Sequence, residues 1–276
     1  MIFSLLTVLF FTASSLGDKY ISANMQCNAK EFSFLVSAST ATFLGLILPF
    51  VGWSFSFSWQ STTALAVLIL CKIAEFYTSA ALLKTVSAYE LKAWLSLNVI
   101  ISFLADLLRG IENFFVAFLP CTVVLITGVC LITFGRKNNN RLRYVFLSMV
   151  YVASKFLYGL QMNTLATDVS PVSVLFLVML CIAVLQLPFI NIRIFFHKKG
   201  LLAGASTRIF NTAGLWTEAA AAQQNLLLYS LVQPMQLAIL FAVALIRQEK
   251  IGKCKLVGSI LTLISVTAVT ILIYYN

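Results

Sequence analysis

The sequence has very little charge for its length. Only 10% of its 276 residues are Asp, Glu, Lys or Arg, and just nine of them are acidic. Ordinary soluble domains carry about 25% charged residues. A chain of this composition is therefore not a soluble globular domain.

The residues of most catalytic and metal sites are scarce as well. His197, beside Lys198, is the only histidine, which excludes histidine-rich metal sites and argues against a Ser-His-Asp triad. The segment from Gly200 to Gly204 lacks the spacing and the lysine of a phosphate-binding loop. The six cysteines are scattered without a C-x-x-C pair, and most lie in apolar segments, where cysteine behaves as a small hydrophobic residue. We therefore expect neither an enzyme activity nor a cofactor or metal.

Long apolar stretches dominate the chain, which is 61% hydrophobic and has a mean hydropathy of +0.96. A membrane-spanning helix needs about 20 apolar residues, so about ten spans fit and leave no room for a soluble domain. We predict an all-α polytopic membrane protein with ten transmembrane helices at residues 3–22, 32–52, 62–83, 87–108, 114–134, 144–162, 171–192, 201–222, 226–246 and 254–274. The eighth span is rich in Ala, Thr, Gly and Gln, so we expect other helices or a cavity around it rather than lipid.

The positive charges occupy alternate gaps between these stretches. Fifteen of the 19 Lys and Arg residues lie in or beside the odd-numbered gaps, whereas Arg109 alone lies in an even-numbered gap. Because cytoplasmic loops are enriched in Lys and Arg, this pattern predicts that both termini lie outside. No basic segment precedes the apolar run Met1–Phe11, which favours an uncleaved first span. Loops held against anionic lipid then account for the net charge of +10, and we expect the lipid bilayer, not nucleic acid, as a partner.

The two halves of the chain resemble each other in three places. Residues 28–35 align with 168–175, 72–75 with 208–211, and 109–112 with 246–249. The polar segment 135–143 separates a first five-helix repeat, residues 1–137, from a second, residues 141–276. An odd number of helices per repeat forces opposite orientations on the two copies, and the opposite charge bias of the halves agrees with this. We predict two inverted five-helix repeats, an architecture that recurs in transporters.

Segments at matching places in the halves resemble the drug/metabolite transporter superfamily, and within it the EamA-type permeases. They run from Tyr77-Thr78-Ser79-Ala80-Ala81 to Gly128-Val129, and from Ala219-Ala220-Ala221 through Gln233-Pro234 and Glu249 to Gly258. The first half departs from the family pattern, with Leu97 where the second has Pro234 and Cys121 where it has Gly258. The resemblance implies a ten-helix transporter with both termini in the cytoplasm. The charge pattern implies the opposite orientation, which we favour.

Lys72, Lys155 and Arg208 lie inside apolar stretches instead of between them. A charge at the centre of a spanning helix costs roughly 2.5–3.5 kcal/mol, so such side chains should face the protein interior. Lys72, Glu75 and Ser79 share one helix face, and Arg208, Asn211 and Glu218 form a stripe on the equivalent helix. These groups either brace helices as ion pairs or line a central substrate cavity, and we favour the cavity. Three cations against two carboxylates leave a surplus of positive charge, which suits a substrate with a carboxylate or phosphate.

Neutral side chains complete the expected substrate-binding set. Asn98, Gln233 and Gln236 could bind the substrate or equally could join helices. Tyr77 and Trp216 could stack on a substrate, although aromatic residues in spans more often pack in the core. Pro188 and Pro234 could bend their helices at a gate, or Pro234 could mark the first turn of its helix.

These observations favour a secondary transporter that moves a small polar metabolite, amino-acid-like or otherwise bearing an anionic group, by alternating access. A desolvated carboxylate could carry a coupling proton, and exchange is the alternative form of coupling. The runner-up is a nucleotide-sugar or sugar-phosphate antiporter, because Tyr89-Glu90-Leu91-Lys92 resembles a segment of such transporters. A non-transporting membrane scaffold and an intramembrane enzyme are alternatives of another class. We expect the protein in a bacterial inner membrane.

Overall fold

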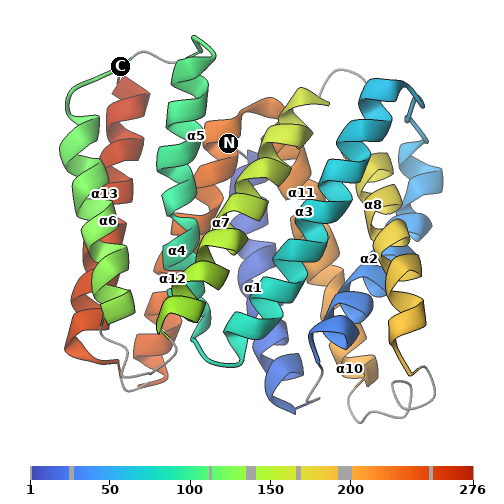
Figure 1. Cartoon of the computed structure of the whole chain (residues 1–276), viewed down its shortest axis with the longest axis horizontal. Helices are drawn as coiled ribbons and strands as arrows, with labels where there is room; N and C mark the ends of the chain where they lie inside the picture. The colour runs from blue at the N-terminus through green and yellow to red at the C-terminus, as the bar shows by residue number, and fades with distance from the viewer. Residues whose placement is uncertain are drawn as a thin grey trace.

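The computed structural model describes residues 2–24, 28–111, 114–134, 141–165, 169–191, 201–248 and 251–275, and these residues form helices joined by short loops (Figure 1). The helices are α1 (Ile2–Asn24), α2 (Ala29–Val51), α3 (Trp59–Leu83), α4 (Ala88–Leu95), α5 (Leu97–Leu108), α6 (Phe118–Phe134), α7 (Arg141–Thr164), α8 (Pro171–Gln186) followed by the 3-10 turn η1 (Leu187–Phe189), α10 (Leu201–Ser206), α11 (Arg208–Gln224), α12 (Leu226–Ile246) and α13 (Lys253–Tyr275). No strand occurs in these ranges, so the predicted all-α fold is confirmed. His197, Glu112, Glu249, Asp168 and residues 135–140 of the predicted linker lie outside the described residues.

Polar residues fix where several helices begin. The Asn28 side chain accepts a hydrogen bond from the backbone N–H of Glu31 at 2.8 Å, and the Glu31 carboxylate accepts one from the backbone N–H of Asn28 at 2.9 Å. Ser58 and Ser170 cap α3 and α8 through the backbone N–H groups three residues later. Such caps are typically worth about 1 kcal/mol each.

Two of the predicted spans are each divided into two helices, and Pro234 lies inside its helix rather than in the first turn. The span at 87–108 divides at Ser96 into α4 and α5, and the span at 201–222 divides at Thr207 into α10 and α11. Pro234 lies in the interior of α12, so the interpretation that it marks the first turn of that helix is wrong. Pro188 lies in η1, directly after α8.

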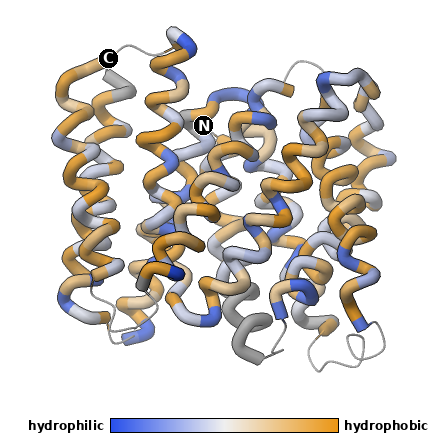
Figure 2. The backbone as a smooth tube through the Cα atoms, viewed as in Figure 1, coloured by the Kyte–Doolittle hydropathy of each residue, from blue (hydrophilic) through white to orange (hydrophobic). Residues whose placement is uncertain are grey.

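Within the described residues, seven helices are long and apolar enough to cross a membrane, as expected of a multi-pass membrane protein. They cover residues 29–51, 59–83, 88–108, 142–164, 171–189, 229–246 and 253–272, and the segments 2–15 and 118–134 are shorter apolar helices. Hydrophobic residues run along most of the helices, whereas hydrophilic ones gather near helix ends and at a few places along the helices (Figure 2). Large apolar side chains such as Phe50, Leu70 and Val123 are exposed on the outside, where lipid would cover them.

Successive helices run in alternating directions through the bundle, and the two helices of α4–α5, like those of α10–α11, run in the same direction (Figure 1). Both termini therefore lie toward the same end, the upper end in this view. The opposite end is where α2, α4, α7 and α13 begin, and it carries several described basic residues of the odd-numbered gaps, including Lys84, Arg143 and Lys253. We call it the basic end.

Five helix pairs have the most extensive contacts: α6 with α13, α2 with α8, α1 with α11, α3 with α7, and α4 with α12. Between α6 and α13, glycine permits the two backbones to come into direct contact. A Cβ atom added at Gly128 would lie 2.8 Å from the carbonyl oxygen of Gly258, and one added at Gly258 would lie 2.6 Å from that of Gly128. The weakly hydrophobic α11 contacts α1, α2, α7, α8, α10 and α12, so the prediction that other helices surround it is confirmed.

Candidate functional site

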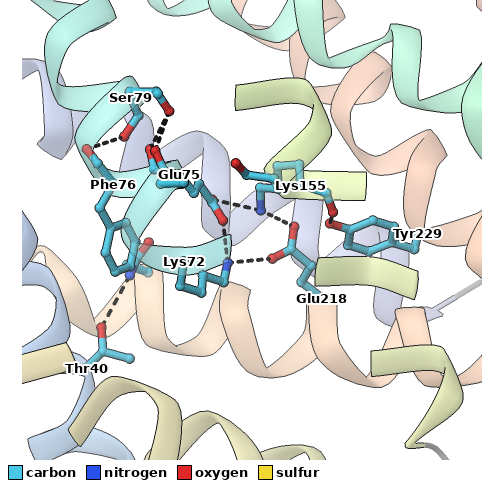
Figure 3. Close-up of polar contacts among 12 residues, drawn as sticks. Thr40, Lys72, Glu75, Phe76, Ser79, Lys155, Glu218 and Tyr229 are labelled. Atoms are coloured by element: carbon cyan, nitrogen blue, oxygen red, sulfur yellow. Dashed lines mark hydrogen bonds and ion pairs between the residues drawn. The ribbon is translucent and has the colours of Figure 1, made fainter. Parts of the chain in front are cut away.

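Four charged side chains form a closed ring at the centre of the bundle (Figure 3). The Nζ atom of Lys72 lies 2.8 Å from Oε2 of Glu75 and 3.9 Å from Oε2 of Glu218. The Nζ atom of Lys155 lies 3.2 Å from Oε1 of Glu75 and 2.7 Å from Oε1 of Glu218. Positive and negative groups thus alternate around this ion-pair ring, whose formal charge is zero.

Three helices supply the ion-pair ring, and it is almost completely buried. Lys72 and Glu75 come from α3, Lys155 from α7 and Glu218 from α11. The exposed fraction of these four side chains does not exceed 10%. Within apolar surroundings an uncompensated charge is costly, so the alternation of sign is what allows the four groups to lie there together.

Neighbouring side chains hold the ion-pair ring in place. The amide of Gln233 on α12 donates a hydrogen bond to Glu218 Oε1 at 3.4 Å and accepts one from Lys92 Nζ of α4 at 3.2 Å. The Lys72 ammonium lies 3.9 Å from the centre of the Tyr158 ring, within the range of a cation–π contact. The Tyr229 hydroxyl donates to the backbone carbonyl oxygen of Lys155 at 2.8 Å. Polar groups of five helices therefore meet at this point.

A cavity of about 70 Å³ lies against one side of the ion-pair ring. Its polar lining consists of Ser14, Ser15, Glu75, Ser79, Lys92, Tyr151, Lys155, Arg208 and Asn211, and its apolar lining of Phe11, Phe32, Val36, Phe76, Leu83, Ala88, Leu91 and Leu215. We call this space the central cavity. Its volume holds a few water molecules and is well below the 300–1,000 Å³ of typical small-molecule sites.

The central cavity extends from the ion-pair ring toward the basic end. Leu83 at the end of α3 and Ala88 at the start of α4 belong to its lining, and both lie at the basic end. On the other side of the ring, Tyr158, Met162 and Tyr229 are completely or almost completely buried. The ring and this apolar layer thus close the cavity toward the end that carries the termini.

Polar contacts also link α11 to α1 and α2 beside the central cavity. Ser14 donates to Asn211 Oδ1 at 3.3 Å, and Asn211 Nδ2 donates to Thr40 Oγ1 at 3.4 Å. Arg208, which is completely buried, donates from Nε and Nη2 to Thr207 Oγ1 at 3.3 and 3.0 Å. The first turns of α11 therefore present donors and acceptors to the cavity.

The structure brings most of the residues predicted for the site together. Seven of them form the ion-pair ring or line the central cavity: Lys72, Glu75, Ser79, Lys155, Arg208, Asn211 and Glu218. Gln233 bridges the ring to Lys92. Lys72 and Glu218 belong to the ion-pair ring and not to the cavity lining, whereas Glu75 and Lys155 belong to both. The charges therefore join helices as ion pairs, and binding of a substrate in the cavity stays a prediction.

The remaining predicted residues lie outside the lining of the central cavity. Tyr77 donates from its hydroxyl to Gln186 Oε1 of α8 at 2.8 Å, and Trp216 is half-buried against the core. Asn98 and Gln236 are buried, and the described part of the chain offers neither amide a hydrogen-bond partner.

Sequence reasoning did not select Lys92, Phe11, Ser14 or Ser15 for the site. Lys92 was counted among the basic residues of an odd-numbered gap, yet it is buried and faces the cavity. Lys92 lies about one helical turn after the start of α4, inside the bundle rather than in the loop. This distance from the loop could have indicated from the sequence that Lys92 is buried. Among the residues that the structure describes, no cluster of three His, Cys, Asp or Glu could hold a metal ion.

Comparison with known proteins shows a similarity of fold. No family model matches the sequence, and no curated protein matches it. A solved structure known only as "Crystal structure of protein" superposes with a TM-score of 0.66, covering 99% of this chain and 97% of its own. Its sequence identity to this chain is 14%, so the similarity is one of fold along the entire chain.

Proposed function

We propose that the protein is a secondary transporter that moves a small polar metabolite bearing an anionic group by alternating access. The observation that carries this proposal is a polar central cavity in the membrane interior that reaches toward the basic end and is closed toward the opposite end by the ion-pair ring. A cavity with one closed side is what one of the two states of such a transporter requires. Its present volume of about 70 Å³ means that helices must separate before a whole metabolite fits.

The proposal includes ten spans arranged as two inverted repeats, and the helix contacts support it. In the proposed repeats, α1, α2, α3, α4–α5 and α6 correspond to α7, α8, α10–α11, α12 and α13. When each helix is exchanged for its counterpart, the pairs α6–α13, α2–α8 and α4–α12 map onto themselves. The pair α1–α11 becomes α7–α3. These are the same five pairs that pack most extensively. A random arrangement of ten helices has no reason to show this regularity.

Atomic contacts between α6 and α13 support the same exchange. Gly128 faces Gly258 at backbone contact, and Ser265 donates to the carbonyl oxygen of Cys121 at 2.5 Å. In the proposed repeats, a residue of α6 corresponds to the residue of α13 that lies 137 positions later, so Gly128 corresponds to Ser265 and Cys121 to Gly258. Exchanging the two halves therefore turns the contact of Gly128 with Gly258 into the contact of Ser265 with Cys121. This agrees with the alignment in which Cys121 corresponds to Gly258.

The positive-inside rule gives the direction in which the cavity faces. The basic end carries the loops enriched in Lys and Arg, and the positive-inside rule supports a cytoplasmic location for it. The central cavity then faces the cytoplasm, and the ion-pair ring is the barrier toward the outside of a plasma membrane. Resemblance to EamA-type permeases supports the transport function, although the family orientation is the reverse of this one.

The test is counterflow in vesicles that contain the purified protein. Preloaded and radiolabelled probes are aspartate, inorganic phosphate, glucose 6-phosphate and UDP-glucose. We expect accumulation of at least one probe by the wild type and its loss in Lys155→Gln, with Lys84→Gln, an exposed residue at the end of α3, as the matched control. Equal accumulation by the wild type, the Lys155→Gln variant and empty vesicles for every probe would refute transport.

A nucleotide-sugar or sugar-phosphate antiporter remains the second candidate because Leu91 and Lys92, which belong to the resembling segment, line the central cavity. Strict exchange separates it from a uniporter or exporter. An antiporter of this kind accumulates glucose 6-phosphate or UDP-glucose only in vesicles preloaded with a phosphate compound.

A further inference from the structure

We propose that Ser14, Thr40 and Asn211 form a latch that keeps the central cavity narrow toward the basic end, and that its opening admits the substrate. The latch joins α11 to α1 and α2, whereas Glu75 and Lys155 of the ion-pair ring join α3 to α7. The inference deepens the proposed function by naming the contacts that must break before a metabolite fits. It rests on that function only for the statement that a substrate enters.

The latch consists of two long hydrogen bonds between neutral groups. Ser14 Oγ donates to Asn211 Oδ1 at 3.3 Å, and Asn211 Nδ2 donates to Thr40 Oγ1 at 3.4 Å. All three side chains are buried, and Ser14 and Asn211 also line the central cavity. Both distances exceed the usual range for such bonds, and neutral hydrogen bonds between membrane helices add little stability. The latch can therefore open without leaving a charge uncompensated.

Asn211 has the place in the second proposed repeat that Glu75 has in the first, because residues 72–75 align with 208–211. Exchanging the halves turns the helix pair α1–α11 into α7–α3. Glu75 contacts Lys155 of α7 at 3.2 Å, and Asn211 contacts Ser14 of α1. Ser14 then corresponds to Lys155, 141 positions later, and the same shift carries the predicted first span onto the sixth. The two contacts are therefore counterparts, and inverted repeats direct them to opposite sides of the cavity.

The two counterpart contacts differ in the cost of breaking them. Lys155 also lies 2.7 Å from Glu218, and separating buried ion pairs leaves uncompensated charges in the membrane interior. Separating Ser14 from Asn211 leaves neutral groups, and a serine hydroxyl on a helix can turn to a carbonyl oxygen of its own backbone. The bundle therefore opens more readily toward the basic end, while the ion-pair ring stays closed.

Contacts between α1 and α11 are closer toward the end that carries the termini. Thr7 Oγ1 donates to Thr217 Oγ1 at 2.8 Å. Between this hydrogen bond and the latch, a Cβ atom added at Gly214 would lie 2.5 Å from Phe11 Cδ1, so the α11 backbone packs directly against the Phe11 ring. The latch is the loosest of these three contacts. Near the latch, α11 can therefore move away from α1 while the contact at Thr7 persists.

Labelling of a cavity cysteine by a bulky thiol reagent tests the latch in the purified full-length protein. In a background without the six native cysteines, Ser79→Cys lies in the cavity lining, and fluorescein maleimide in dodecyl maltoside is the probe. We expect Asn211→Leu to raise the labelling rate at least fivefold, because both hydrogen bonds of the latch are lost. Ser14→Ala/Thr40→Val keeps Asn211 but removes both of its partners, so it should raise the rate by a similar factor.

Two controls separate opening of the latch from a general loosening of the bundle. Thr217→Val removes the other hydrogen bond between α1 and α11, which lies outside the cavity lining, and should leave the Ser79→Cys rate unchanged. Met162→Cys lies beyond the ion-pair ring, where the native side chain is fully buried. It should stay unlabelled with and without Asn211→Leu, because the ring is intact in both.

An unchanged Ser79→Cys rate in either latch variant overturns the proposal. Labelling of Met162→Cys in the presence of Asn211→Leu, or an equal increase with Thr217→Val, also overturns it, because the bundle would then have loosened as a whole. If neither latch variant folds, the contact is a structural brace, and the proposal is overturned as well. Faster labelling without counterflow of any probe leaves the latch standing and refutes transport, whereas counterflow with unchanged labelling refutes the latch and leaves transport standing.

Discussion

Lys155 Nζ and Glu218 Oε1 are 2.7 Å apart and join α7 to α11 at the centre of the bundle. Both side chains are almost completely buried, so neither charge can be solvated by bulk water. The same lysine also lies 3.2 Å from Glu75 of α3. Lys155 on α7 therefore ties α3 and α11 together.

Removing one member of this pair should destabilise the fold strongly. Breaking a buried ion pair by removing one partner typically costs 3–5 kcal/mol, because the other charge stays buried without compensation. We expect Glu218→Gln to lower the free energy of unfolding by about 3 kcal/mol, measured by denaturant titration in detergent. Lys155→Gln/Glu218→Gln should lose clearly less than the sum of the single variants, while exposed Lys84→Gln should have almost no effect. Additive losses would show that the two groups are not coupled.

Breaking the ion-pair ring should also open the bundle on the far side of the central cavity. In a background without the six native cysteines, Ser79→Cys lies in the cavity and should react with a membrane-impermeant thiol reagent. Met162→Cys, which lies two helical turns beyond Lys155, should stay unreactive because the native side chain is fully buried. Adding Lys155→Gln should make Met162→Cys reactive. If Met162→Cys reacts equally with and without Lys155→Gln, the ring is not a barrier.

The contact between α6 and α13 should tolerate no added side chain at Gly258. A Cβ atom there would lie 2.6 Å from the carbonyl oxygen of Gly128 and 2.8 Å from Ile132 Cγ1, so the two helices would have to separate. Overpacking of this kind costs about 1–3 kcal/mol, and we expect a loss of that size for Gly258→Ala in thermal or denaturant unfolding. Gly252→Ala is the matched control, because a Cβ atom added there meets no atom within 4 Å. Equal stability of the two variants would contradict the close helix contact.

The orientation of the protein can be measured at two exposed loop positions. Lys84 lies at the basic end, after α3, and Ile111 lies at the opposite end, after α5. In whole cells and a cysteine-free background we expect Ile111→Cys to react with an impermeant thiol reagent and Lys84→Cys to react only after the membrane is permeabilised. The reverse result would show that the family orientation holds and that the charge pattern misleads.

Much of the helical arrangement could be predicted because it depends on short stretches of sequence. Each predicted apolar span coincides with a helix or with two helices in line, since hydropathy and the spacing of apolar residues are local properties. The pairing of Lys72 with Glu75 followed in the same way from three residues of separation on one helix, and their atoms lie 2.8 Å apart. The breaks at Ser96 and Thr207 were missed because neither residue is a strong helix breaker.

The contacts between helices could not be predicted, because they depend on how each helix is rotated and how deep each residue lies. Lys155 meets Glu218 across 63 positions of sequence, and Lys92 meets Gln233 across 141. Sequence alone determined that the chain is all-α, apolar and basic in alternate loops, and that Lys72, Lys155 and Arg208 had to face the interior. Only the tertiary structure decided that two of these cations are neutralised in the ion-pair ring while Arg208 and the overlooked Lys92 border a cavity. The physical reason is that the cost of a buried charge is set by the groups around it, and packing brings those groups from other helices.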